Sequence, residues 1–249
     1  MLHKWHIEPE QYLRHETRRG RRHGYEWLDP KRTALVVIDM VPFFVGDPDI
    51  GHYPRGIVPN INTLARVLRQ AGGTVAWVLP AANEPSPATV ELLGAKVAEL
   101  YRTSGGGGPL LSRLWHEFDV ASTDLLVEKS SASAFFPGRS ELPGLLEAHD
   151  IESVLVTGTV ANVCCESTAR DASTLGYRTI MVADANAALR DQDLNATLHT
   201  FYRTFGDVRP TSEIVELISV GRPQKNHSLT SVLPFSEECR FGNCGTVGE

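Results

Sequence analysis

The sequence predicts a single-domain, doubly wound α/β fold, in which helices flank a parallel sheet. Two observations carry this prediction. Short apolar runs, each suited to a strand buried on both faces, alternate with segments whose apolar residues recur at helical spacing. The 249 residues, 42% of them hydrophobic, also suffice to bury one complete core. Parallel strands of this kind require right-handed crossover connections through helices.

The predicted strands and helices alternate along the chain. Strands are expected at 34–38, 74–79, 125–128, 154–156, 179–183 and 207–209. Helices are expected at 58–68, 87–102, 142–149, 164–175 and 191–204, with a last helix that begins at Ser212 as N-cap. Gly72, Gly73 and Gly176 are expected to end two of these helices. Four glycines at 105–108 follow no strand directly and precede no Gly-Lys-Ser/Thr sequence, which favours a flexible connection over a phosphate loop.

The parts of the chain outside 33–220 are interpreted as two arms. Residues 1–32 are polar, with a basic cluster at 18–23, and we expect a solvated arm that is suited to reaching another subunit. Residues 221–249 show little periodicity and are expected to form an irregular tail. No internal repeat or long linker divides the region between them, so 33–220 is expected to be one domain.

Charge and composition argue against several classes of protein. A formal net charge of −6 gives no basic field to attract nucleic acid. No apolar run approaches the roughly 18 residues of a membrane span, and the first six residues lack the apolar core of a signal peptide. Four cysteines, two of them adjacent, do not resemble a disulfide framework. A small-molecule enzyme of the cytoplasm is therefore expected.

Three reactive side chains come at or just after the carboxyl ends of predicted strands: Asp39, Lys129 and Cys164. Sites of open parallel sheets form at this edge. A cysteine in the first turn of a helix also meets backbone N–H groups and the positive end of the helix dipole, which favour thiolate. Each residue has a structural alternative, as a capping carboxylate, a surface lysine or a small core side chain, but three at one edge favour a site.

The chemistry expected of these residues is nucleophilic catalysis without a metal or cofactor. Asp39 would take the proton of Cys164, and Lys129 would keep Asp39 ionised and stabilise developing negative charge. Backbone N–H groups around Ala161 and Cys164 would bind the oxyanion. Attack on a carbonyl carbon next to nitrogen would give a thioester, which water then cleaves.

With these residues the chain resembles the isochorismatase-like cysteine hydrolases over about residues 32–219. The resemblance rests on a hydrophobic strand ending in Asp39, on Lys129 followed by a Ser-Ala-Phe-type segment at 130–135, and on a Gly-x-x-Thr-x-x-Cys-like loop at 158–164. Weaker matches occur at 166–172, 184–188 and 205–210. Each motif alone is weak, but their order and separation make the resemblance specific.

The resemblance implies a six-stranded, Rossmann-like sheet of order 3-2-1-4-5-6 and a hydrolase acting on carbon–nitrogen bonds other than peptide bonds. It implies that Cys164 rather than Cys165 is the nucleophile, with Cys165 in the helix packing. It further implies a cis peptide bond between Val160 and Ala161, and a homodimer or homotetramer.

The chain also departs from the family pattern. After Asp39 and Met40, the apolar residues Val41-Pro42 stand where polar ones are usual, and Ala161 replaces a threonine. Residues 79–83 lack the Asp-x-His metal motif of nicotinamidase members, which disfavours a zinc-assisted nicotinamidase. Isochorismatase itself lacks the cysteine nucleophile, so vinyl-ether hydrolysis is disfavoured too.

Amides, ureido or carbamoyl compounds and lactams remain as substrates, the last as in streptothricin hydrolase-like members. An apolar wall is expected near the site, with core packing as the alternative for its members: Phe43, Phe44, Phe135 and Phe136. Two other classes stay open. A metal site at His227, Cys239 and Cys244 has weak ligand spacing, and a non-catalytic binding or scaffold relative would have no physical reason to retain all three reactive groups.

Overall fold

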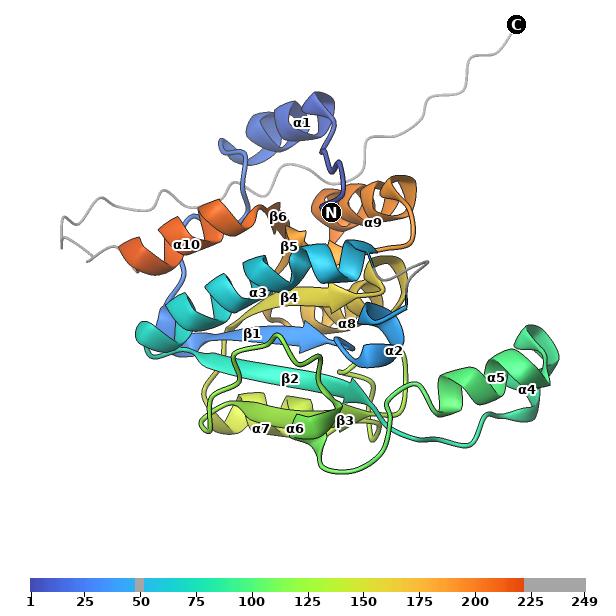
Figure 1. Ribbon diagram of the computed structural model, residues 1–249. Helices are drawn as coiled ribbons and strands as arrows, with labels where there is room; N and C mark the ends of the chain where they lie inside the picture. The colour runs from blue at the N-terminus through green and yellow to red at the C-terminus, as the bar shows by residue number, and fades with distance from the viewer. Residues whose placement is uncertain (48–51, 222–249) are drawn as a thin grey trace, which may run out of the picture.

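The computed structural model describes residues 1–47 and 52–221 of the chain, and its centre is one all-parallel sheet. The six strands lie in the order β3-β2-β1-β4-β5-β6 (Figure 1). They are β1 (Thr33–Ile38), β2 (Thr74–Pro80), β3 (Leu125–Lys129), β4 (Ser153–Thr159), β5 (Arg178–Ala187) and β6 (Asp207–Arg209). The predicted fold class and strand order are confirmed.

The helices lie between the strands and at the two ends of the chain. They are α1 (Pro9–Arg19), α2 (Pro42–Val45), α3 (His52–Gln70), α4 (Pro87–Leu93), α5 (Ala95–Arg102), α6 (Leu110–Arg113), α7 (Leu142–Ala148), α8 (Glu166–Thr174), α9 (Asp191–Thr204) and α10 (Thr211–Val220). Two short segments have other helical geometry, the 3₁₀ helix η1 (Pro30–Arg32) and the π-helix η2 (Ala161–Cys165). In the described part of the chain, no helix is both long and apolar enough to cross a membrane.

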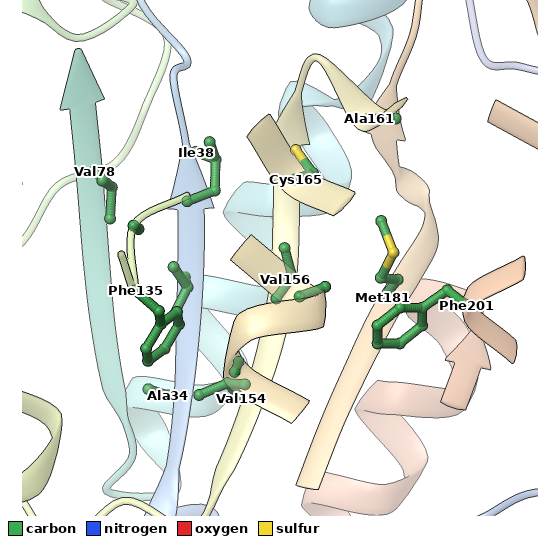
Figure 2. Close-up of a cluster of buried hydrophobic side chains, with 14 of the residues drawn as sticks. Ala34, Ile38, Val78, Phe135, Val154, Val156, Ala161, Cys165, Met181 and Phe201 are labelled. Carbon is green, nitrogen blue, oxygen red and sulfur yellow. The ribbon is translucent and has the colours of Figure 1, made fainter. Parts of the chain in front are cut away.

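Each face of the sheet is covered by its own set of helices. Every residue of β1 is buried, and side chains of successive residues point to opposite faces. Ala34, Val36 and Ile38 join the core cluster that includes side chains of α7, α8 and α9, part of which Figure 2 shows. Leu35 and Val37 join the cluster that includes side chains of α3 and α10. This double burial explains the continuous apolar runs in the sequence.

Two helix predictions are wrong, one in the middle of the helix and one at its start. The predicted helix 87–102 is two helices, because Gly94 adopts φ 79° and ψ 149° and breaks the run; the pair projects away from the sheet (Figure 1). The last helix begins at Thr211 rather than being capped by Ser212. The Asp184 carboxylate of β5 accepts hydrogen bonds at 2.7 Å from both the Thr211 N–H and its hydroxyl, so the cap comes from the sheet.

The N-terminal arm packs on its own chain. Its helix α1 turns Tyr12 and His15 against Tyr202 of α9, with ring centroids 5.3 and 4.8 Å away. The buried Asp207 carboxylate hydrogen-bonds the His23 ring at 2.9 Å and the Gly24 N–H at 3.1 Å. The expectation of a solvated arm is therefore wrong for its inward face, because polar side chains there are paired with buried groups of the domain.

Two further expectations concern loops. The Arg113 guanidinium donates to the carbonyls of Gly105 and Pro80 at 2.7 and 2.6 Å, so the first of the four glycines is fixed rather than flexible. The expected irregular tail lies, apart from Gly221, outside the described residues. The weak metal-site candidate at His227, Cys239 and Cys244 lies there as well.

Candidate active site

Asp39 is placed by the end of β1 at the centre of the sheet. Its N–H donates to the Val78 carbonyl at 2.9 Å, which extends the strand ladder by one residue. Its φ of 54° then turns the chain out of the strand, a conformation uncommon for residues other than glycine. The residue is 1% exposed, so the carboxyl group is held in the protein interior at the carboxyl edge of the sheet.

Lys129 reaches Asp39 from the edge strand β3, past the end of β2. Its Nζ lies 2.9 Å from Asp39 Oδ2, and both side chains are almost fully buried. The ammonium also donates to the Ser131 carbonyl at 3.1 Å. The other carboxyl oxygen, Asp39 Oδ1, is buried and meets no hydrogen-bond partner among the described residues. One carboxyl oxygen is thus neutralised by the lysine, and the other is free to accept a proton.

The two adjacent cysteines face different surroundings. Cys164 is partly exposed, and its thiol interacts with both the Asp39 carboxyl and the Lys129 ammonium. Cys165 is completely buried, with Sγ 3.9 Å from the Thr157 carbonyl oxygen. Figure 2 shows Cys165 within the buried apolar cluster. As expected, Cys165 belongs to the packing, and Cys164 is the cysteine that meets the other two reactive groups.

The surroundings of Cys164 oppose the thiolate that a helix start favours. Burial of the thiol and the nearby Asp39 carboxylate raise its pKa to about 12, and the opposing effect of Lys129 is smaller. The resting cysteine is therefore a thiol rather than a thiolate. A helix start favours thiolate only modestly, whereas desolvation and a like charge both favour the neutral form.

Asp39 and Lys129 perturb one another as a buried pair. Burial raises the pKa of Asp39, although Lys129 counteracts it. Burial alone would lower the pKa of Lys129, but the Asp39 carboxylate raises it above its ordinary value. The lysine thus stays charged, and the carboxyl titrates at higher pH than an exposed aspartate.

The loop that precedes Cys164 is fixed by close backbone contacts. Gly158 has φ 117°, and a Cβ atom there would lie 2.2 Å from the Ile38 carbonyl oxygen. The cis peptide bond joins Thr159 and Val160, so the expected position between Val160 and Ala161 is wrong by one residue: the bond directly follows the last residue of β4. The Val160 carbonyl accepts from the N–H groups of residues 163 and 165, at 3.0 and 3.3 Å.

The four phenylalanines divide into two groups. Phe44 and Phe135 are 7% and 2% exposed and belong to the two cores, so the core-packing alternative holds for them. Phe43 is half-buried, with its ring centroid 6.1 Å from that of Tyr101, and Phe136 is 52% exposed. Phe43 and Phe136 therefore remain as candidate pocket residues.

A surface cavity lies away from the three reactive residues. It has a volume of about 750 Å³ and lies near the amino ends of β4 and β5, lined by residues that include Arg32, Glu152 and Tyr177 but none of the three reactive ones. Within 1–47 and 52–221, no group of three or more His, Cys, Asp or Glu side chains is arranged to hold a metal ion.

Sequence reasoning missed the residues that support Lys129. Ser131 accepts from the ammonium through its carbonyl, and the buried Thr168 hydroxyl accepts from the Ala134 N–H at 3.1 Å. The only available signal was the run of serines and small residues directly after Lys129, which is typical of a tight, hydrogen-bonded loop.

Comparisons with known proteins show the family to which the chain belongs. The model of the isochorismatase domain matches residues 33–213. An uncharacterized isochorismatase family protein, YwoC of Bacillus subtilis (strain 168), is 30% identical over 195 residues, which cover 77% of this chain and 96% of YwoC. Ureidoacrylate amidohydrolase RutB of Rhizobium rhizogenes is 26% identical over 216 residues, covering 79% of this chain and 87% of RutB.

A solved structure is similar as well. The crystal structure of a cysteine hydrolase from Pseudomonas syringae pv. phaseolicola 1448A superimposes with a TM-score of 0.69 at 26% identity, and the match covers 80% of this chain and 97% of the other. The fold, the family model and these relatives lead to one conclusion: the chain belongs to the isochorismatase family and is a hydrolase of the amidohydrolase type.

Proposed function

We propose that this enzyme cleaves a non-peptide carbon–nitrogen bond through a thioester on Cys164. The observation that carries the proposal is the buried contact of 2.9 Å between Lys129 and Asp39, with the Cys164 thiol beside both groups. A nucleophile, a base and a cation within reach of one another are the parts that acyl transfer needs.

The first half-reaction begins from the thiol. Asp39 takes the proton as Cys164 Sγ attacks the carbonyl carbon, because a thiol with a pKa of about 12 is hardly ionised at neutral pH. The negative charge that develops on oxygen would be bound by backbone N–H groups of the turn at 160–164. Asp39 then gives its proton to the departing nitrogen, the carbon–nitrogen bond breaks, and the acyl group stays on sulfur.

The second half-reaction returns the enzyme to its starting state. Asp39 takes a proton from water, and the oxygen of that water attacks the thioester carbon. The carbon–sulfur bond breaks, the acid is released, and Cys164 recovers the proton from Asp39. Throughout, the Lys129 ammonium stabilises whichever of Asp39 and Cys164 carries the negative charge.

For the substrate we propose a small molecule with an amide, ureido, carbamoyl or lactam group. The similarity to ureidoacrylate amidohydrolase RutB favours the ureido and carbamoyl members of this set. Phe43 and Phe136, the two phenylalanines outside the cores, would add an apolar contact that suits a larger lactam. Because the nucleophile is a free thiol, we also propose that the enzyme works in the reducing cytoplasm.

The test compares the two cysteines. We expect Cys164→Ala to abolish ammonia or amine release from a panel of amides, ureido acids, carbamoyl amino acids and lactams, while its thermal unfolding stays close to that of the wild type. Cys165→Ala, the matched control, should retain activity, since its sulfur only fills the core. Mass spectrometry should find an acyl adduct on the peptide that contains Cys164. Activity that survives in Cys164→Ala, or no activity of the wild type on any class, would refute the proposal and favour a non-catalytic binding protein.

We further propose that the enzyme is a homo-oligomer, and that α4 and α5 take part in the contact. These short helices project from the domain (Figure 1). They expose large apolar side chains, and an exposed apolar patch of this kind is typical of a protein–protein contact. The side chains are Leu92, Leu93, Val97, Leu100 and Tyr101. Light scattering on the eluting protein should give a dimer or tetramer mass, and Leu92→Ser with Leu100→Ser should lower it. A monomer mass for the wild type would contradict the proposal.

A further inference from the structure

We propose that Thr168 is a positioning residue: from the helix that follows Cys164, its buried hydroxyl fixes the loop that aims Lys129 at Asp39. The proposal rests on the proposed function, since it names a residue that holds the proposed catalytic residues in place. Thr168 itself meets no reacting group in our assignment.

Lys129 needs support from outside the sheet. It ends β3, an edge strand that among the described residues pairs with β2 alone and has, on its other side, an isolated bridge from Lys129 to Ser140. The backbone of Lys129 is therefore held by the ladder with β2 and by this bridge, but a lysine side chain is long and flexible. The ammonium is oriented by its contact with Asp39, its hydrogen bond to the Ser131 carbonyl and the neighbouring Cys164 thiol.

The loop that carries this carbonyl is held by its own hydrogen bonds. The Ser131 hydroxyl donates to the Ser133 carbonyl at 2.7 Å, and the Ser133 hydroxyl accepts from the Phe135 N–H at 3.1 Å. Ser133, Ala134 and Phe135 are 4%, 0% and 2% exposed, so the far half of the loop is buried. The buried half of the loop therefore determines where the Ser131 carbonyl lies, and with it the position of the Lys129 ammonium.

Thr168 ties the loop to the nucleophile's helix. Its hydroxyl oxygen accepts from the Ala134 N–H at 3.1 Å, and the threonine is completely buried. It follows Cys164 by four residues, about one helical turn. A buried N–H without a partner is costly, so losing this acceptor would drive the loop to rearrange. The continuous helical segment of η2 and α8 thereby positions both the sulfur and, through Ala134 and Ser131, the ammonium.

The test uses acylation by p-nitrophenyl acetate, which reports on Cys164 without the natural substrate. We expect Thr168→Val, which keeps the shape but loses the acceptor, to slow p-nitrophenolate release roughly tenfold or more, because small misplacements are costly in catalysis. Thr168→Ser, which keeps the hydroxyl, should restore most of the rate. Thr179→Val is the matched control, because it removes another fully buried threonine hydroxyl, bonded to the Tyr177 carbonyl at 3.1 Å, near the amino end of β5 and three strands away from β2.

The pH dependence separates positioning from general destabilisation. Among the described residues, Lys129 from β3 and Cys164 from η2 are the titratable groups that face Asp39, and Lys129 lowers its pKa. If the ammonium moves away in Thr168→Val, the acid limb of the rate profile should shift by roughly one unit to higher pH. In Thr179→Val the limb should stay in place even if the melting temperature falls.

Several outcomes would overturn the inference. One is a wild-type rate and acid limb in Thr168→Val; another is a Thr168→Ser variant as impaired as the valine one, which would show that only packing matters. Should Thr168→Val fail to fold, Ser131→Ala interrupts the same series of hydrogen bonds at a partly exposed side chain. If the acid limb of the rate profile of Ser131→Ala lies at the wild-type pH, the proposal is refuted. If Cys164→Ala is inactive and Thr168→Val has the wild-type rate, this inference alone is refuted. If Cys164→Ala is fully active, the proposed function is refuted and this inference with it.

Discussion

The centre and the edge of the sheet hold the reactive groups in different ways. Asp39 and the Cys164 loop leave β1 and β4, which are neighbours and are each paired on both sides. Lys129 leaves β3, which in the described part of the chain has a neighbouring strand on one side and an isolated bridge to Ser140 on the other. The two central groups are therefore positioned by backbone ladders, whereas the lysine depends on side-chain and loop contacts. Substitutions at the centre should damage fold and activity together, and those at the edge should separate the two.

The largest effect is expected for Gly158→Ala at the centre. The new methyl group would overlap the Ile38 carbonyl oxygen, and the backbone conformation, with φ 117°, disfavours any side chain. We expect a loss of about 2–5 kcal/mol in the free energy of unfolding, from strain and overpacking combined, with loss of activity in the folded fraction. Urea denaturation measures the first and p-nitrophenyl acetate acylation the second.

Gly176→Ala is the control for this substitution. Gly176 also has a positive φ, 96°, but a Cβ atom there would meet nothing within 4 Å. It should cost only about 1 kcal/mol, from backbone conformation alone. If the two variants are equally stable, the contact between Gly158 and Ile38 does not hold the central strands as described.

A smaller effect on stability, with a large one on rate, is expected for Lys129→Met at the edge. Without the ammonium, the pKa of Asp39 rises further, because burial is then opposed only by the weaker contact with Cys164. Asp39 then stays protonated over a wider pH range and cannot accept the proton of Cys164. The rate of acylation at neutral pH should therefore fall by about 100-fold or more. Lys96→Met, an exposed substitution on α5, should leave the rate unchanged.

The sign of the pH effects follows from the direction of the Asp39 shift. Burial raises the folded-state pKa of this carboxyl, so the wild-type acid limb should lie above the ordinary value of about 3.9 and move higher still in Lys129→Met. When the pKa of a carboxyl is higher in the folded than in the unfolded state, the free energy of unfolding falls as the pH rises above the pKa of the unfolded state, because the unfolded chain loses the proton first. The stability deficit of Lys129→Met should therefore be larger at pH 7 than at pH 4. If the stability deficit is the same at pH 4 and pH 7, it is not caused by the buried Asp39 carboxyl that has lost its lysine partner.

The sequence alone was sufficient for the parts of the molecule that local pattern determines. Continuous apolar runs marked the strands, because both faces of β1 are covered, and strand ends marked Asp39 and Lys129. What pattern could not supply was the effect of distant groups. The cap at Thr211 comes from Asp184 on β5, and the protonated state of Cys164 results from its burial beside Asp39. Gly94 ends α4 although apolar spacing continues through it.

The pairing of β1 with β4 also has a consequence for how this chain is made. The partner of β1 on one side begins only at Ser153, far along the sequence, so a nascent chain that has emerged through β2 presents an unpaired apolar edge. Contacts between such distant segments form late, and exposed edges invite association with other chains. Asp39 meets neither Lys129 nor Cys164 until β3 and η2 have emerged. Catalytic competence and protection from aggregation therefore arrive together, when the second half of the sheet docks on the first.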